Sequence, residues 1–144
     1  MEIKDIHRLE EAMILLLNFE GWDLKHSGNG KLPYDAIGKT QKGYPCVIEM
    51  KFRKKHYDTK MLEKGKYDTL MAMDDKLVKI YLVNDEKGNF MYYLNELDMP
   101  PLEKKRCPRN TIWKGGKEQK EVYMLKENDA IRININKPLR PYEK

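Results

Sequence analysis

The chain has 144 residues, of which 40% are hydrophobic and 35% are charged, and its formal net charge is +5. This length suits one domain with a real core, and the composition predicts a globular protein rather than a disordered one. The longest apolar run, Ala12 to Leu17, is far shorter than the roughly 20 residues that a membrane span needs. Charged residues precede that run, which argues against a secretory signal segment. Two cysteines without CxxC spacing argue against a disulfide framework, so we expect an intracellular, cytoplasmic protein with no membrane partner.

Positive charge is concentrated in two stretches of the chain. Residues 1–103 carry 16 Lys and Arg against 18 Asp and Glu, whereas residues 104–144 carry 12 against 5. Residues 51–66 hold seven Lys and Arg but only two acidic residues. Basic patches attract polyanions, and nucleic acid is the usual polyanionic partner. A lysine-rich solvated surface explains the same charge equally well.

Hydrophobic spacing predicts an amphipathic helix at the start of the chain. Apolar residues recur at helical intervals over about residues 4–20, and Gly21 stands where a left-handed C-terminal cap needs a glycine. A second helix is predicted over residues 58–73, although Gly65 weakens it. The expected strands, which turn-rich segments separate, are residues 22–26, 34–40, 44–52, 77–83, 90–94, 121–125 and 130–135.

Two pairs of these strands, the second with the third and the last with the one before it, are close enough in sequence to form hairpins. The order of elements predicts an α/β or α+β fold in which helices flank a central mixed sheet. We expect a single domain, with a core over about residues 4–98 and a β-rich basic C-terminal extension over about residues 99–144.

Three charged residues near the middle of the chain point to a specific chemistry. Asp35 is followed 14 residues later by Glu49, and Lys51 stands two residues beyond. Because side chains alternate along a strand, Glu49 and Lys51 face one side while the apolar residues around them face the core. Asp35 lies on the neighbouring strand of the predicted hairpin, so its carboxylate can converge on that of Glu49.

Such a group suits a divalent metal and a phosphodiester. Two carboxylates and a backbone carbonyl form a hard oxygen site for Mg²⁺ or Mn²⁺. Water on such a metal can attack a phosphodiester, and a neighbouring lysine can orient the water or stabilise the charge that develops. The alternative is an exposed hairpin edge on which the Glu and Lys form an ordinary cross-strand pair.

The order of these features resembles that of the PD-(D/E)XK, or restriction-endonuclease-like, nucleases, especially the small Holliday-junction-resolvase-like and phage-type members. Those enzymes begin with a helix that carries a glutamate and ends at a Gly-aromatic pair. A strand, a Ser-Gly loop, the motif aspartate and an apolar strand ending in Glu-x-Lys follow. The matching residues, within about residues 5–83, are Glu10, Gly21-Trp22, Ser27-Gly28, Asp35 and Ile48-Glu49-Met50-Lys51. The chain departs from the pattern at Tyr34, because the family usually has proline directly before the aspartate and Pro33 lies one residue earlier.

The resemblance implies a role for each motif residue. Asp35 and Glu49 would bind Mg²⁺ or Mn²⁺, the Met50 carbonyl would assist, and Lys51 would be catalytic. A glutamate of the first helix would serve as an auxiliary ligand of metal or water. Helical geometry favours Glu10, on the flank of the apolar stripe, over Glu11, which falls almost opposite the stripe. A boundary Glu10 bonded to a surface lysine is the alternative.

Seven further residues are expected to contact nucleic acid. Lysines directly after the Glu-x-Lys strand suit phosphate contacts, which dominate non-specific affinity. In the resembled fold, the next helix and the Ser-Gly loop border the cleft, although a solvated face explains the helix lysines as well. A basic loop near residue 115 is expected to grip DNA. The residues are Ser27, Lys54, Lys55, Lys64, Lys66, Lys114 and Lys117.

We therefore expect a metal-dependent endonuclease that hydrolyses DNA phosphodiesters, either a junction resolvase or a nicking enzyme of the phage or mobile-element type that viruses encode. A nuclease of this size that cuts both strands generally works as a symmetric dimer, so a homodimer is expected. Two alternatives stay open. One is a module with the same fold that binds nucleic acid without cutting it. The other is a small basic scaffold or inhibitor protein in which the Asp and the Glu-x-Lys are coincidental.

Overall fold

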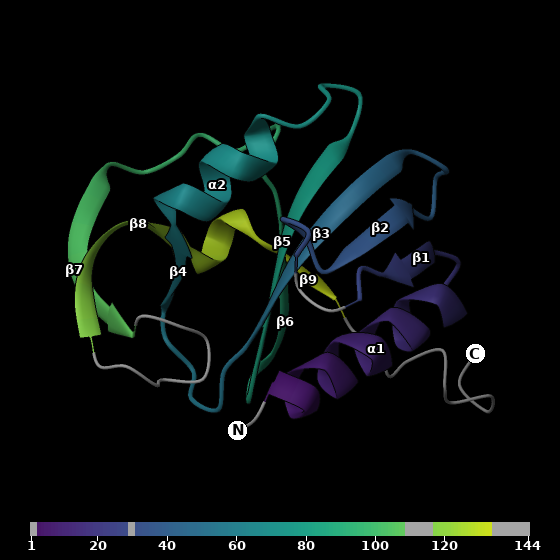
Figure 1. Ribbon diagram of the computed structural model, residues 1–144, viewed down its shortest axis with the longest axis horizontal. Coiled ribbons are helices and arrows are strands. Elements are labelled where there is room, and N and C mark those ends of the chain that lie inside the picture. The colour runs from purple at the N-terminus through teal and green to yellow at the C-terminus, as the bar shows by residue number, and fades with distance from the viewer. Residues whose placement is uncertain (1–2, 29–30, 109–116, 134–144) are drawn as a thin grey trace.

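The computed structural model describes residues 3–28, 31–108 and 117–133, which form two α-helices and two β-sheets (Figure 1). The elements in chain order are α1 (Ile3–Phe19), β1 (Asp23–His26), β2 (Ala36–Lys39), β3 (Pro45–Phe52), β4 (Thr59–Glu63), α2 (Lys64–Met71), β5 (Val78–Asp85), β6 (Gly88–Tyr93), β7 (Leu102–Pro108), β8 (Lys117–Lys126), the 3-10 helix η1 (Glu127–Asp129) and β9 (Ile131–Ile133). No helix in these ranges is long and apolar enough to cross a bilayer.

The larger sheet has six strands in the order β1-β2-β3-β5-β6-β9, and the smaller sheet has three in the order β4-β8-β7. Neighbours in the larger sheet pair antiparallel except β3 and β5, which run parallel. The fold is therefore mixed α+β with a central mixed sheet, which confirms the predicted fold class.

Helix α1 covers one face of the larger sheet (Figure 1). Its residues Met13, Ile14 and Leu17 are buried in one cluster with Ile48 and Met50 of β3. These helix residues fall on one side because residues three and four apart share a face. The predicted amphipathic helix is confirmed, and the even-numbered side chains of β3 point into the core beneath it.

The opposite face of the larger sheet packs against α2 and the smaller sheet. Val47 of β3 and Tyr81 of β5 share an apolar cluster with Leu62 of β4, Leu70 of α2 and Leu125 of β8. Figure 1 shows the smaller sheet and α2 on the side of the larger sheet away from α1. Strand β3 is thus buried on both faces, and polar side chains on it lie between two layers.

The prediction of one helix over residues 58–73 is wrong in its first part. Residues 59–63 form β4, which pairs antiparallel with β8. Burial alternates along β4, with Lys60 and Leu62 buried and their neighbours half-buried, as a strand between two layers requires. Helix propensity in this segment is overridden by pairing with a distant strand, and only Lys64–Met71 are helical.

The predicted hairpin of residues 121–125 with 130–135 is also wrong. Strand β8 pairs with β4 and β7, whereas β9 pairs with β6 of the larger sheet. The turn η1 between them directs the chain from one sheet to the other, and residues 134–135 lie outside the described part. Residues 102–133 therefore add strands to both sheets, and the expected division at about residue 99 stays a prediction.

Two leucines of α1 test the core beneath β3. Leu17 is fully buried, whereas Leu15 is 71% exposed. We expect Leu17→Ala to lower the free energy of unfolding by about 2–5 kcal/mol, because it removes buried apolar surface and leaves a cavity. The matched Leu15→Ala change should cost less than about 0.5 kcal/mol. Urea denaturation measures both, and equal losses would contradict the packing of α1.

Candidate active site

Asp35 stands where the β2–β3 ladder ends. Strand β2 begins at Ala36, which pairs with Ile48, and the Asp35 N–H donates to the Ile48 carbonyl at 2.8 Å. Farther along β3, a side chain replaces the backbone as hydrogen-bond partner, because the Met50 N–H donates to Asp35 Oδ2 at 2.7 Å. The carboxylate of Asp35 is therefore held against the middle of β3.

The backbone carbonyl of Met50 faces the same edge as its N–H. In a strand, the N–H and C=O of one residue point to the same neighbouring strand. The Met50 side chain packs in the core and is 4% exposed, so it contributes no polar group. The Met50 carbonyl oxygen is thus directed toward the side on which Asp35 lies, as a third oxygen beside two carboxylates.

Glu49 is buried next to this edge with only one cationic partner within hydrogen-bonding distance among the described residues. The residue is 7% exposed, and its Oε1 accepts a hydrogen bond from Lys66 Nζ of α2 at 2.9 Å. Burial raises the pKa of Glu49 to about 7, the Asp35 carboxylate raises it as well, and Lys66 opposes both. A buried carboxylate whose ionisation is disfavoured by a second carboxylate beside it fits a divalent cation, which would relieve the repulsion.

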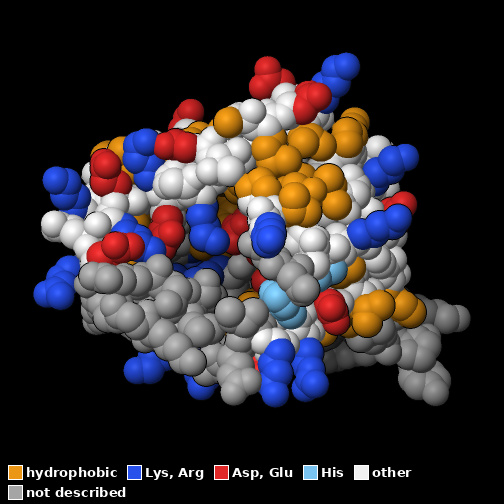
Figure 2. All heavy atoms as spheres, in the orientation of Figure 1, with side chains coloured by type: hydrophobic (Ala, Val, Ile, Leu, Met, Phe, Trp, Pro, Cys, Tyr) orange, Lys and Arg blue, Asp and Glu red, His pale blue; other side chains and the backbone are white. Residues whose placement is uncertain are grey.

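Lys51 lies on the same side of β3 as Glu49. Burial, together with the charges of Arg53 and Lys66, lowers the pKa of Lys51 to about 8. Both Glu49 and Lys51 line a cleft between β3, β4, β5 and α2. The residues that line this cleft are Glu49, Lys51, Arg53, Met61, Leu62, Glu63, Lys66 and Tyr81. Lys, Arg, Asp and Glu side chains meet near the centre of the face that Figure 2 shows.

Glu10 approaches Asp35 from α1. It is 5% exposed, and its Oε1 lies 2.8 Å from Nε2 of His26. The Gly28 N–H donates to Nδ1 of His26 at 3.1 Å, so Nε2 of the neutral ring carries the proton that Glu10 accepts. Burial raises the pKa of Glu10, and the charge of Asp35 also raises it against the lowering effect of His26. By contrast, the Glu11 side chain is 62% exposed.

The structure brings two further predicted residues next to this group. The Ser27 N–H donates to the Asp35 carbonyl at 2.9 Å, which places the Ser-Gly loop beside the aspartate. Lys66 is the ion-pair partner of Glu49, and its side chain is 45% exposed. Burial alone would lower the pKa of Lys66, but Glu49 and Asp35 outweigh that effect and raise it.

The other predicted basic residues lie around rather than within this group. Lys54 and Lys55 are exposed in the segment after β3. Lys64 at the start of α2 forms an ion pair with Asp68 one turn along the helix. Lys117 begins β8 opposite Pro108 of β7, and Lys114 lies outside the described residues.

Three residues of the site were not identified from the sequence. His26 is the partner of Glu10, and only its place directly before the Ser-Gly loop could have pointed to it. Arg53 and Glu63 line the cleft, and Lys120 of β8 holds Glu63 Oε1 at 3.0 Å. Alternation past Lys51 could have pointed to Arg53, whereas Glu63 could not have been found by spacing, because it depends on β4 packing over β3.

Neither a family model nor a curated protein matches the chain. Among solved structures, the fold is similar to that of Hjc, a Holliday junction resolvase from the archaeal hyperthermophile Archaeoglobus fulgidus. The TM-score is 0.59 over 94% of this chain and 97% of that chain, at 11% sequence identity. At this identity the likeness concerns the fold, and it agrees with the restriction-endonuclease-like architecture expected from the sequence.

The raised pKa of Glu49 predicts a pH dependence of stability in the metal-free protein. Between pH 4.5 and about 7 the folded protein keeps a proton on Glu49 that the unfolded chain releases, so the free energy of unfolding falls as the pH rises. Glu49→Gln has no such proton. The stability of the wild type relative to Glu49→Gln should therefore decrease across this window by a few kcal/mol, since one pKa unit corresponds to about 1.4 kcal/mol.

Urea denaturation of both proteins in the presence of a chelator, at several pH values, measures this difference. A constant difference between the two proteins from pH 4.5 to about 7 would contradict the buried, carboxylate-facing environment of Glu49.

Proposed function

We propose that this chain is a metal-dependent endonuclease that hydrolyses DNA phosphodiester bonds. The observation that supports this most strongly is the convergence of Asp35 and Glu49 just before the start of β2, with Lys51 in the cleft beside Glu49. The likeness in fold to a Holliday junction resolvase favours branched DNA as the substrate, so we propose a junction resolvase or a nicking enzyme.

Asp35, Glu49 and the Met50 carbonyl are the groups that would hold the metal. They are hard oxygen donors, which suit Mg²⁺ or Mn²⁺ better than a softer ion. When bound, such an ion supplies Lewis acidity at the phosphate and lowers the pKa of water. The hydrogen bond from Met50 keeps the Asp35 carboxylate fixed, and the Lys66 ion pair fixes that of Glu49. The donors are thus oriented by the fold.

Lys51 supplies positive charge at the reacting phosphate. With a pKa of about 8 it is mostly protonated at neutral pH, and its ammonium would stabilise the negative charge that develops on the phosphate oxygens. Arg53 and Lys66 line the same cleft and would attract the DNA backbone. Glu10, oriented by His26, is placed to position a water on the Asp35 side.

We further propose that the nuclease acts as a homodimer. Cleavage of both strands at symmetric positions needs two sites related by a two-fold axis. One chain of 144 residues has one Asp-Glu-Lys group of this type in its described part. Analytical ultracentrifugation measures the oligomeric state independently of activity.

A second candidate function is DNA binding without cleavage. The ion pair of Lys66 with Glu49 favours it, because the pair already gives this buried carboxylate a cationic partner. In that case the cleft would accept the phosphate backbone through Lys51, Arg53 and Lys66, and metal would be unnecessary. Cleavage assays separate the two functions.

The nuclease function is tested with supercoiled plasmid and a synthetic four-way junction in Mg²⁺ or Mn²⁺. Asp35→Ala removes a proposed metal ligand, and Lys51→Ala removes the charge that stabilises the transition state. We expect each change to reduce the cleavage rate by about 100-fold or more, as loss of a single electrostatic stabiliser does. Lys42→Ala, an exposed lysine in the β2–β3 turn, is the matched control and should retain the wild-type rate.

Cleavage that requires metal and is lost in both site variants, but kept in Lys42→Ala, would support the nuclease. Wild-type protein that binds the junction without ever cutting it would instead establish the binding function. Protein that neither binds nor cuts DNA would contradict both.

The neighbouring glutamates of α1 form a matched pair for the role of Glu10. Glu10→Gln keeps the shape of a buried side chain that faces His26 and Asp35 but removes its charge, whereas Glu11→Gln changes an exposed side chain. We expect Glu10→Gln to slow metal-dependent cleavage by about 10- to 100-fold, the usual effect of losing an outer carboxylate of a metal site. Glu11→Gln should leave the rate within about twofold, and equal effects would show that Glu10 has no special role.

A further inference from the structure

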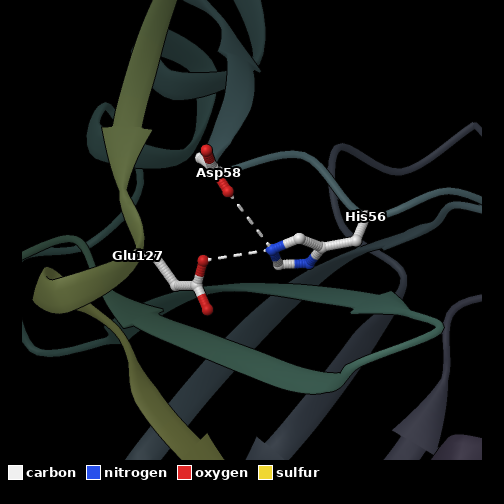
Figure 3. Close-up of side chains that lie close together, drawn as sticks. All are labelled: His56, Asp58 and Glu127. Atoms are coloured by element: carbon white, nitrogen blue, oxygen red, sulfur yellow. Dashed lines mark ion pairs between the residues drawn. The ribbon is translucent and has the colours of Figure 1, made fainter.

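A second group of potential ligands lies where the segment after β3 meets η1. His56 and Asp58 precede β4, and Glu127 begins η1 (Figure 3). Nε2 of His56 is 3.3 Å from Glu127 Oε2 and 3.7 Å from Asp58 Oδ1. Ligand atoms bound at about 2.1 Å to one metal ion lie roughly 3.0–3.4 Å apart. The two distances to Nε2 are close to those of a metal site, and the three ligand atoms all lie within 4.8 Å of one another.

Asp85 determines which nitrogen of His56 faces the two carboxylates. Nδ1 lies 2.8 Å from Asp85 Oδ2, whose side chain is 1% exposed. Nδ1–H therefore donates to Asp85, and in the neutral ring Nε2 presents its lone pair to Glu127 and Asp58. Lys60 Nζ, 3.4 Å from Nδ1, has shorter contacts with Asp85 and with the Tyr57 carbonyl. A carboxylate behind a ligating histidine is the usual outer partner in zinc proteins.

Around this group the carboxylates outnumber the cations, which favours the binding of a cation. Three carboxylates, Asp58, Asp85 and Glu127, approach the His56 ring. Two cations oppose them, Lys60 on Asp85 and Arg132 at 3.8 Å from Glu127 Oε1. The His56 side chain is 8% exposed and that of Asp85 is 1% exposed, so water screens this contact poorly. The lone pair of Nε2 and the two carboxylate oxygens are all donors that a cation placed between them would accept.

We propose that His56, Asp58 and Glu127 bind a divalent transition-metal ion such as Zn²⁺, with Asp85 as the outer carboxylate and water completing the coordination. One imidazole and two carboxylates suit Zn²⁺ better than Mg²⁺, which takes oxygen ligands. None of the three residues lines the cleft of Glu49 and Lys51. The ion would join the segment leading into β4 to the turn after β8, at one end of the paired strands β4 and β8.

Titration of Zn²⁺ into Asp35→Ala protein, followed by calorimetry, tests the site without competition from the proposed catalytic metal. We expect one Zn²⁺ per chain. Asp58→Asn should weaken its binding at least tenfold, and the side chain of Asp58 is fully exposed, so this variant keeps the fold. Glu127→Gln should do the same, and Asp85→Asn should weaken binding by about 10- to 100-fold. Asp129→Asn, an exposed acid of the same turn, is the matched control and should bind as tightly as its parent.

Thermal unfolding provides a second measurement on the same proteins. Zn²⁺ should raise the unfolding midpoint of Asp35→Ala protein by several degrees, because a ligand that binds only the folded state stabilises it. The shift should disappear in Asp58→Asn and persist in Asp129→Asn. Absence of Zn²⁺ binding, or equal binding in all variants, would overturn the proposal and leave a protonated His56 as the bridge between the carboxylates. Because the parent lacks Asp35, this outcome is independent of whether the wild type cleaves DNA.

Discussion

The hydrogen bond between the Met50 N–H and the Asp35 carboxylate is the contact on which the site depends. Strand β2 begins only at Ala36, the partner of Ile48, so β3 continues past the start of its neighbour with its backbone in a buried place. A buried N–H without a partner costs about 1–3 kcal/mol, and the Asp35 side chain removes that cost. The same bond brings a negative charge next to Glu49. The same hydrogen bond therefore closes the end of the β2–β3 ladder and places Asp35 beside Glu49.

Burial of so many charges requires partners from several elements. Glu49 on β3 is paired by Lys66 of α2, and Glu10 on α1 is bonded to His26 of β1. Burial, and after it the charges of Arg53 and Lys66, lowers the pKa of Lys51. As a result, Glu49, Glu10 and Lys51 are each less favourably ionised than in water. A divalent cation bound in the cleft would offset the negative charge of the carboxylates, and a phosphate anion would offset the positive charge of the lysine.

The sequence predicted those parts of the fold that depend on neighbours in the chain. Alternation along one strand was enough to place Glu49 and Lys51 on the face away from α1. The same local reasoning failed for residues 59–63, because their partner strand β8 lies more than fifty residues farther along. His26 was missed for a similar reason, since its role depends on a contact with α1 rather than on its own segment. Side-chain partners across layers leave no periodic signal.

The basic C-terminal region, expected only to add charge and strands, also affects the position of a residue in the site. Lys120 of β8 holds Glu63, the last residue of β4, whose extended backbone leads directly into α2. Lys66, the partner of Glu49, follows Glu63 by three residues, so its place is set by the point at which β4 ends and α2 begins. Pairing of β4 with β8 therefore helps to determine where the counter-ion of Glu49 lies. In this fold the smaller sheet contributes to the electrostatics of the site although it provides neither of the acidic residues that converge there.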